Sequence, residues 1–450
     1  MALAVFLIFL GVLLLCVVRG WFVGWALLAG LALFFALGLR RGCRAGELAD
    51  RAAACVRKSG VVLLVLALIG GVTGLWRASG TITYCVHHGL RLITPRLFLL
   101  LIFLMNAALS YVLGTSFGVA STAGVIMMAL ARFGGVSASL TAGAVLSGIY
   151  FGDRCSPVSS SASLVAAVTE TSLPDNLRLM RRTGALPLAL TAGVYGLLSV
   201  LHPLGGVAPA LAAAVEQSFV LSPLSLLPVA VILALPLVRA PIYVTLLSSM
   251  AAAAGVAVGV QGMSLSAVLR AVFLGYRATG ELEAVLSGGG VRGMLSTCLV
   301  VLLTSLCSGV LEGTRVLEPL EEKVFRLGRR WGRFPAAVLT GLGTSMVFCN
   351  QTIAVMLSEQ LLRRGYGDRS ELAIDIENAG VLLTALVPWS VAASAPLAML
   401  EAGPEALPCA ALLWMTPLCY LFTKKYFFPA GRAELPQAAS DASAERQDCL

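Results

Sequence analysis

Two stretches of this chain have the same layout, and they constrain its fold more than any other feature. The first, 113–164, contains LGTSFGVASTAG and then GAVLSGIYFGDRCSPVSSSASL. The second, 348–395, contains FCNQTIAVMLSEQ and then IENAGVLLTALVPWSVAASA. Each begins with a small or polar interruption of an apolar run, continues through a Gly-rich helix that carries an acid, and ends on a Pro followed by small hydroxyl residues. The same order of apolar and less apolar segments precedes both, which indicates two copies of one unit.

The composition indicates a membrane protein. Of the 450 residues, 58% are hydrophobic and 12% are charged, whereas a soluble domain carries about 25% charged residues. Apolar runs near 20 residues recur along the chain, which matches helices that cross a hydrocarbon core of about 30 Å. A transmembrane β-barrel would show alternating segments of about ten residues instead. The sequence therefore predicts an all-α polytopic membrane protein in a lipid bilayer.

The same pattern predicts how the chain is divided. The N-terminal apolar run lacks a basic start and a small-residue cleavage site, so we expect it to be retained as a first helix. The polar, Ala/Ser-rich C-terminus is expected to be disordered. The expected parts are an N-terminal helix pair with a basic cytoplasmic loop (1–59), a first inverted repeat (60–183), linking transmembrane helices (184–275), a second inverted repeat (276–404), a last transmembrane helix (405–428) and a disordered tail (429–450).

The basic residues predict the orientation of the chain. Six of them lie within 40–58, three within 178–182, and Lys424 and Lys425 follow the last apolar run. Because Lys and Arg are enriched in cytoplasmic loops, both termini are expected in the cytoplasm of a cell with this protein in its cytoplasmic (inner) membrane. The net charge of +9 therefore reports topology, and no nucleic-acid partner is expected.

A less apolar helix precedes each copy, and its charge differs between the two. The helix at 81–96 carries only Arg91 and Arg96, whereas the one at 315–333 carries six Lys or Arg. This bias places the two helices on opposite sides of the membrane. The copies would then be inverted repeats, with discontinuous helices or re-entrant hairpins that meet near the bilayer midplane.

Paired repeats with interrupted hydrophobic segments are the sequence mark of a secondary transporter. Catalysis is not expected, because no GxGxxG, Walker or HExxH pattern stands on a suitable element. The 11 cysteines are scattered without CxxC spacing, so neither a cysteine metal site nor a cofactor is expected.

The interruptions are the first candidate binding elements. They are Gly114-Thr115-Ser116 and Asn350-Gln351-Thr352. Irregular backbone at membrane depth persists only where it lines a cavity, and its carbonyl groups and helix ends can replace the water around a small cation. The alternative is that these polar side chains only hold neighbouring helices together.

Asp153 is the candidate ligand for Na⁺ and the candidate carrier of a proton. A carboxylate at membrane depth is costly and usually faces a pathway or a partner. It can hold a cation when ionised or a proton when neutral, and Ser156, Ser159 and Ser160 would supply neutral oxygens around the substrate. The alternative is a structural ion pair with Arg154.

Glu377, next to Asn378, is the matching acid of the second copy and the candidate second site carboxylate. The alternative is that Asp375 and Glu377 cap the start of a helix at the surface, where the helix dipole favours acids. Arg77, in the break before the first lateral helix, is expected to be an interfacial anchor.

At these residues the chain resembles the NhaC-type sodium/proton antiporters. GTSFGVASTAGV is similar to the family's Gly-Thr-Ser-Trp-Gly stretch, and SGIYFGDRCSPVSSSASL to its Ser-Gly-x-Tyr-Phe-Gly-Asp stretch, which continues into Ser-Pro-x-Ser-Asp. IENAGVLLTALVPW is similar to its Leu-Glu-Asp-Ser-Gly stretch, which ends in Pro-Trp. The resemblance implies an inner-membrane secondary transporter that exchanges Na⁺ for H⁺. It also implies that some relatives couple these ions to organic acids or amino acids.

The chain departs from the family pattern at several polar positions. Ser160 stands where the family has Asp, Ser163 where it has Asn, and Asn378 where it has an acid. Loss of formal charge weakens a site for a hard cation. Cation/proton antiport is therefore the first hypothesis, and a proton- or sodium-coupled porter of a small organic acid or amino acid is the second; a homodimer stays open.

Overall fold

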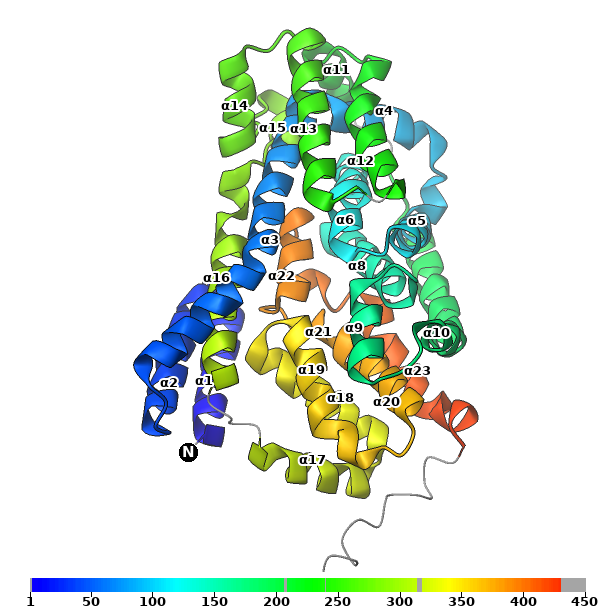
Figure 1. Cartoon of the computed structure of the whole chain (residues 1–450). Coiled ribbons are helices and arrows are strands. Elements are labelled where there is room, and N and C mark those ends of the chain that lie inside the picture. The colour runs from blue at the N-terminus through cyan, green and yellow to red at the C-terminus, as the bar shows by residue number, and fades with distance from the viewer. Residues whose placement is uncertain (1, 206–208, 239, 314–317, 430–450) are drawn as a thin grey trace, which may run out of the picture.

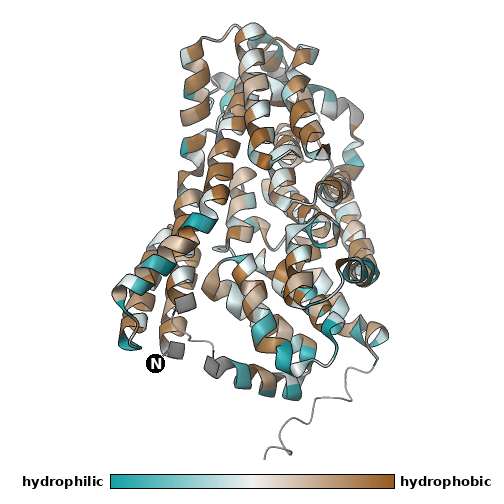
Figure 2. Cartoon of the chain, in the orientation of Figure 1, coloured by the Kyte–Doolittle hydropathy of each residue, from teal (hydrophilic) through white to brown (hydrophobic). Residues whose placement is uncertain are grey.

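The computed structural model describes residues 2–205, 209–238, 240–313 and 318–429 (Figure 1). Over these residues the fold is helical, and its one β-type pairing is an isolated bridge between Tyr276 and Gly288. Six of the described helical segments are long and apolar enough to cross a membrane. They are Ala45–Ala78, Pro95–Leu113, Ser116–Phe133, Leu173–Leu201, Ile242–Gly259 and Val291–Leu311. The prediction of an all-α chain with several membrane-length helices is confirmed, and Figure 2 shows hydrophobic residues along the outer helices.

The N-terminal part consists of α1 (Ala2–Val18), α2 (Gly24–Arg40) and α3 (Ala45–Ala78). The expected basic loop at 40–58 is wrong over most of its length, because α3 already begins at Ala45. The sequence AGELADRAAACVRK is rich in strong helix formers and contains no Pro. The basic residues after Arg44 therefore extend the apolar helix rather than interrupt it.

The first copy is a series of helices that starts after α3. Its members are α4 (Thr81–Leu92), η1 (Pro95–Leu97), α5 (Phe98–Leu113), α6 (Ser116–Val119), the π-helix η2 (Ala120–Gly124), α7 (Val125–Phe133), α8 (Ala138–Cys155) and α9 (Ser160–Val168). The second copy repeats this order after α16 (Val291–Gly313). Its members are α17 (Glu318–Trp331), α18 (Arg333–Phe348), α19 (Gln351–Leu362), η5 (Arg363–Gly365), α20 (Arg369–Ile376), the π-helix η6 (Glu377–Val381), α21 (Leu382–Thr384) and α22 (Val391–Met399).

The two series match element by element. In each, a lateral helix is followed by a helix that breaks, a second helix after the break, a long helix, and a short last helix. The short last helices, α9 and α22, have nine residues each and begin at a serine cap, Ser159 or Ser390. The lateral helices α4 and α17 lie at opposite ends of the molecule (Figure 1).

The remaining helices connect the two series and follow the second. They are α10 (Leu173–Leu201), α11 (Pro209–Ser218), η3 (Pro223–Leu226), α12 (Leu227–Leu237), α13 (Ile242–Gly259), α14 (Leu265–Leu274), η4 (Gly280–Leu282), α15 (Glu283–Leu286), η7 (Pro404–Ala406) and α23 (Ala411–Phe427). The expected disordered tail falls on 430–450, which lies outside the described residues, and the other expected part boundaries stay predictions.

Each series places its short last helix against the other series. α9 contacts α19, while α22 contacts α6 and η2. Thus the last helix of each copy packs beside the helix that follows the break in the other copy. Helices α3 and α16, which lead into the two series, also pack along each other. This exchange brings the two breaks and the two short helices into one region.

Close packing of α5 on α8 depends on a glycine. A Cβ added at Gly152 would lie 2.3 Å from Ser110 Cβ and 2.3 Å from the Tyr111 nitrogen. We expect Gly152→Ala to lower the free energy of unfolding by about 1–3 kcal/mol, as overpacking does. Thermal unfolding in one detergent checks this, with Gly193→Ala in α10, where a Cβ meets open space, as the matched control. Equal transition temperatures for the two variants would contradict the prediction.

Candidate functional site

Both predicted interruptions are helix breaks of the same geometry. α5 ends at Gly114 (φ 67°) and α18 ends at Cys349 (φ 57°), each in the left-handed conformation. Gly is required at the first, because a Cβ there would lie 2.5 Å from Val158 Cγ2. At the second, an L residue accepts a strain of about 1–2 kcal/mol. The Cys349 carbonyl, released from its helix, accepts a hydrogen bond from the Val391 N–H at 2.9 Å.

The residue after each break caps the next helix. Thr115 Oγ1 accepts from the Gly118 N–H at 3.3 Å, and Asn350 Oδ1 accepts from the Thr352 N–H at 2.9 Å. These two predicted site residues therefore satisfy the orphan donors of a helix start. Gln351 Nε2 donates to the Val381 carbonyl at 3.0 Å, which ties the second break to η6.

Serine hydroxyl groups surround the carboxyl group of Asp153 at the end of α8. Ser159 Oγ donates to Asp153 Oδ1 at 3.1 Å, and Ser161 Oγ lies 3.4 Å from the Asp153 main-chain carbonyl oxygen and 2.9 Å from Ser159 Oγ. The Ser116 hydroxyl group also lies close enough to act on this carboxyl group. The Asp153 residue is only 6% exposed. The structure thus joins α6, α8 and α9 at one carboxylate.

The serines around Asp153 were predicted in part. Ser159 hydrogen-bonds to the carboxylate, next to which it was predicted. Ser116, predicted as part of the first break, and Ser161, which the sequence analysis did not single out, lie near it. Ser156 is buried beside them and accepts from the Val158 N–H at 3.3 Å. Ser160 is exposed on the first turn of α9. Because α9 starts to turn at the Ser159 cap, Ser161 faces back toward α8, whereas Ser160 faces away from it.

Arg154 does not form the ion pair with Asp153 that the sequence left open. Its Nη2 donates to Asn378 Oδ1 at 2.5 Å and to Thr183 Oγ1 at 3.1 Å. Successive residues of a helix point about 100° apart, so neighbours need not share a partner. Arg154 instead connects α8 to the π-helix of the second copy, and its Nε has no hydrogen-bond partner.

Glu377 and Asn378 begin the π-helix η6 and are both fully buried. Both carboxylate oxygens of Glu377 and the Nδ2 of Asn378 lack hydrogen-bond partners. The charges of Arg154 and Asp153 both act on the Glu377 carboxyl group, with that of Arg154 the stronger. Buried unpaired polar atoms are costly, and π-helical turns are frequent at functional sites.

The alternative of a surface helix cap at Asp375 and Glu377 is wrong. α20 begins at Arg369, and its cap is Asp368, whose Oδ1 accepts from the Ser370 N–H at 2.8 Å. Asp375 and Glu377 lie farther along, in the buried interior.

The spacing from the serine caps also revises the match between the two acids. Ser159 Oγ reaches Asp153 Oδ1 six residues back, and Ser390 Oγ reaches the Thr384 carbonyl six residues back. By this register, the counterpart of Asp153 is Thr384 and not Glu377. Glu377 approaches the Asp153 region from the earlier part of the helix, through η6.

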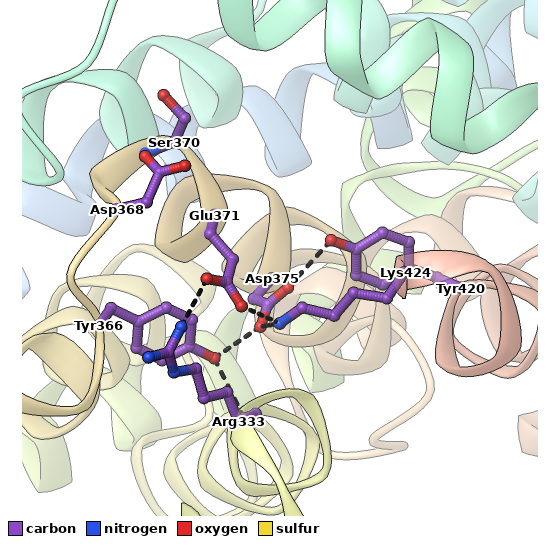
Figure 3. A network of polar contacts seen from close by, with 8 residues as sticks. All are labelled: Arg333, Tyr366, Asp368, Ser370, Glu371, Asp375, Tyr420 and Lys424. Atoms are coloured by element: carbon purple, nitrogen blue, oxygen red, sulfur yellow. Dashed lines mark hydrogen bonds and ion pairs between the residues drawn. The ribbon is translucent and has the colours of Figure 1, made fainter. Parts of the chain in front are cut away.

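A second buried polar network lies beside this site, where Asp375 and Glu371 of α20 meet Lys424 of α23 (Figure 3). Lys424 Nζ pairs with Asp375 Oδ2 and lies 2.7 Å from Glu371 Oε1. The Tyr420 hydroxyl donates to Asp375 Oδ1 at 3.1 Å. The side chain of Lys424, a residue expected at the cytoplasmic end of the last helix, thus points into the protein.

The network also ties α20 to α18. Arg333 Nη1 lies 2.8 Å from Glu371 Oε2. The Tyr366 hydroxyl lies 2.6 Å from Asp375 Oδ2 and 3.0 Å from the Arg333 carbonyl, so it can donate to one of them at a time. The charges of two cations and two carboxylates therefore cancel in an almost fully buried network.

A third group pairs Glu401, after α22, with Arg132 of the first copy and with Arg77 of α3, the helix that leads into that copy. Arg77 Nη2 and Arg132 Nη1 each lie 2.8 Å from Glu401 Oε2. The Arg77 side chain is 5% exposed, so the expected interfacial anchor is a buried ion pair.

The arrangement at Asp153 suits a small hard cation or a proton. Carboxylate and hydroxyl oxygens are the ligands that hard cations prefer. A neutral carboxyl group carries a proton and an ionised one holds a cation, so the two compete for one group. The hydroxyl groups can donate to the ionised carboxylate or turn their lone pairs to a cation.

A model of the Na⁺/H⁺ antiporter family matches residues 148–423. This region includes Asp153 and Glu377, while the first break lies before it and Lys424 directly follows it. Curated relatives extend the similarity to most of the chain. The Na⁺/H⁺ antiporter NhaC of Alkalihalophilus pseudofirmus is 25% identical, with 79% of each chain covered.

Two other relatives are described as exchanging organic solutes. The malate-2H⁺/Na⁺-lactate antiporter of Bacillus subtilis is 26% identical, over 79% of this chain and 78% of the relative. The arginine/ornithine antiporter ArcD of Halobacterium salinarum is 27% identical, over 73% of this chain and 70% of the relative. The same scaffold is therefore shared by proteins described with different cargo.

Proposed function

The chain belongs to the Na⁺/H⁺ antiporter family, and we propose that it exchanges Na⁺ for H⁺ across the cytoplasmic membrane as a secondary active transporter. The observation that carries this proposal is the buried carboxyl group of Asp153 with the hydroxyl groups of Ser116, Ser159 and Ser161 around it. This donor set provides one exchangeable charge and several neutral oxygens.

In this proposal, Na⁺ and H⁺ compete for Asp153. When Na⁺ binds, the carboxylate must be ionised and its proton must leave; when the proton returns, the carboxyl group loses its hold on the cation. Glu377 is the second acid, because its two oxygens are buried without hydrogen-bond partners. A group in that condition needs a proton, a cation or a nearby cationic side chain to be stable.

Movement between the two sides would come from one helix series rocking against the other. The matched order of elements and the lateral helices at opposite ends (Figure 1) support inverted repeats related by an axis in the membrane plane. Such repeats alternate access around a fixed central site. The end that carries α17 faces the cytoplasm in this proposal, because its basic residues follow the positive-inside rule.

A second candidate function is proton- or sodium-coupled transport of a small organic acid or amino acid. Arg154 favours it, because this buried cation has an amide, Asn378, as its nearest partner in the second copy and leaves Nε unpaired. A carboxylate of an organic substrate could complete that guanidinium group. The relatives described as malate/lactate and arginine/ornithine antiporters fit the same reading.

The two functions are separated by one assay. The purified chain is placed in vesicles that contain a pH-sensitive dye, and a pH gradient is imposed. Na⁺/H⁺ antiport predicts that added NaCl dissipates the gradient in the absence of any organic solute, while choline chloride does not. If NaCl has no effect but malate, lactate or arginine does, the second function replaces the first.

A further inference from the structure

Two glutamates occupy the same unusual backbone position in the two copies. Among the described residues, only Glu170, Cys349 and Glu401 are residues other than Gly with positive φ. Glu170 (φ 58°) and Glu401 (φ 50°) each lie 11 residues after the serine cap of a nine-residue helix, α9 or α22. The next N–H in each, of Thr171 or Ala402, donates to a carbonyl five residues back at 2.9 Å. Both helices therefore end in the same Schellman turn.

An acid is an unfavourable choice at this turn. The position usually holds Gly, because an L side chain in the left-handed region costs about 1–2 kcal/mol. Both copies nevertheless carry Glu there. Strain of this kind persists where the surrounding structure has a use for the side chain.

The use is an ion pair to the other copy. Glu170 Oε1 lies 2.7 Å from Arg363 Nη2, just after α19. Glu401 Oε2 lies 2.8 Å from Arg132 Nη1, near the end of α7, and 2.8 Å from Arg77 Nη2. Each glutamate thus joins the last helix of one copy to the helix that follows the break of the other.

The two groups lie at opposite ends of the molecule. Arg77 is near the end of α3, four residues before α4, whereas Arg363 is in η5, which contacts α17. Helices α4 and α17 are at opposite ends in Figure 1. Neither group includes the Asp153 carboxyl group or its hydroxyl partners.

The two groups differ in strength. The side chains of Glu170 and Arg363 are 65% and 40% exposed, and Arg363 Nε also lies 3.5 Å from Glu359 Oε1 in its own copy. Arg363 therefore keeps an acid when Glu170 leaves. Glu401 is 27% exposed and holds two arginines, one of them buried, and accepts from the Gly289 N–H at 3.1 Å. Exposed ion pairs are weak, whereas separating a buried cation from its partner is costly.

Both glutamates are charged at neutral pH. The hydrogen bond and charge of Arg363 hold the pKa of Glu170 below its usual value. Burial alone would raise the pKa of Glu401, but the charges of Arg77 and Arg132 outweigh burial and lower it.

We infer that these two groups are opposing latches of the transport cycle, both formed in the described state, with the stronger one at the Glu401 end. The Glu401 latch consists of Glu401, Arg77 and Arg132, and the Glu170 latch of Glu170 and Arg363. The inference rests on the proposed function, because latches at two ends matter only where access alternates. When the Glu170 latch opens, Arg363 stays paired with Glu359, so this weak latch opens readily. The Glu401 latch is stronger and determines the rate of the slower transition.

The test is backbone hydrogen exchange of the full chain in lipid nanodiscs. Glu401→Gln is expected to raise exchange at 125–135 and 391–402 by about tenfold or more, as loss of a buried pair does. It should also lower exchange at 160–170 and 351–365, because opening one end closes the other. Glu170→Gln should do the reverse, by less than about fivefold, as for an exposed pair. Arg132→Gln removes one of the two arginines and leaves Arg77 paired with Glu401, so it gives the Glu401 result at smaller amplitude if Glu401→Gln does not fold.

The reciprocal change separates a latch from a local structural contact. If each variant only loosens its own end, the inference fails. It also fails if the matched controls Glu405→Gln and Asp175→Asn, which alter exposed acids near the two groups, behave as the latch variants do. Hydrogen exchange needs no cargo, so reciprocity in a chain that moves no Na⁺ would overturn the proposed function and not the latches. Na⁺ exchange without reciprocity would overturn the latches alone.

Discussion

Asp153→Asn is expected to lower Na⁺-dependent proton exchange by at least about 100-fold, the scale on which loss of a positioned proton-transfer group slows a reaction. Asparagine keeps the size of the side chain and one oxygen that accepts from Ser159 Oγ, whose distance to Asp153 Oδ1 is 3.1 Å. It carries neither the negative charge that holds a cation nor a proton that can be exchanged. The loss should therefore be one of function, with the fold preserved.

The measurement is the rate of dye response to NaCl in vesicles with equal amounts of folded protein. Ser160→Ala is the matched control, because Ser160 is exposed on the same short helix and should leave the rate within about twofold, as a surface substitution does. Full pH-dependent exchange by Asp153→Asn would show that the carboxyl group is structural. In that case Glu377, whose two carboxylate oxygens have no hydrogen-bond partner, becomes the first candidate for the group that exchanges Na⁺ for H⁺.

The positions of the helix breaks could be predicted because they depend on local sequence. Gly114 supplies the left-handed turn, and Thr115 and Asn350 are strong N-cap residues next to it. The serine at Ser159 is another local cap. Signals of this kind act within four residues, so they survive in a single sequence whatever the distant parts of the fold do.

The partners of the buried charges could not be predicted in this way. Arg154 bonds to Asn378, 224 residues away, rather than to its neighbour Asp153. Glu377, the acid that looked equivalent to Asp153, precedes the residue that matches Asp153 by the serine caps, Thr384, and lies in the π-helix η6, which no hydrophobic period reveals. The position of Ser161 near Asp153 had a weak sequence signal. Ser161 lies two residues after the helix cap Ser159, where the first turn of α9 faces back toward α8.

The start of α3 was missed although the signal for it is local. Charge suggested a loop over 40–58, but local helix propensity overrode charge after Arg44. Lys424 was expected at the cytoplasmic end of the last helix, and its side chain instead pairs with two buried acids. Positive charge near the end of an apolar helix is thus no sufficient sign of a loop or of an exposed side chain.

Lys424→Ala is expected to lower the free energy of unfolding by about 3–5 kcal/mol, as removal of one partner from a buried ion network does. Lys424 Nζ pairs with Asp375 and lies 2.7 Å from Glu371 Oε1, and the side chains of these acids are 0% and 3% exposed. Without Lys424, Arg333 is the remaining cation of the network for two carboxylates (Figure 3). The tyrosine hydroxyl groups on Asp375 supply hydrogen bonds but no positive charge.

Thermal unfolding in detergent checks this, with Lys425→Ala as the matched control. Lys425 is exposed and its Nζ lies 5.2 Å from the centroid of the Tyr426 ring, so its loss should cost no more than about 1 kcal/mol. Adding Asp375→Asn to Lys424→Ala removes the unpaired charge and keeps an oxygen for Tyr420, so it should recover part of the lost stability. Equal unfolding of the Lys424 and Lys425 variants, or no recovery in the double variant, would mean that the charge balance does not hold α18, α20 and α23 together.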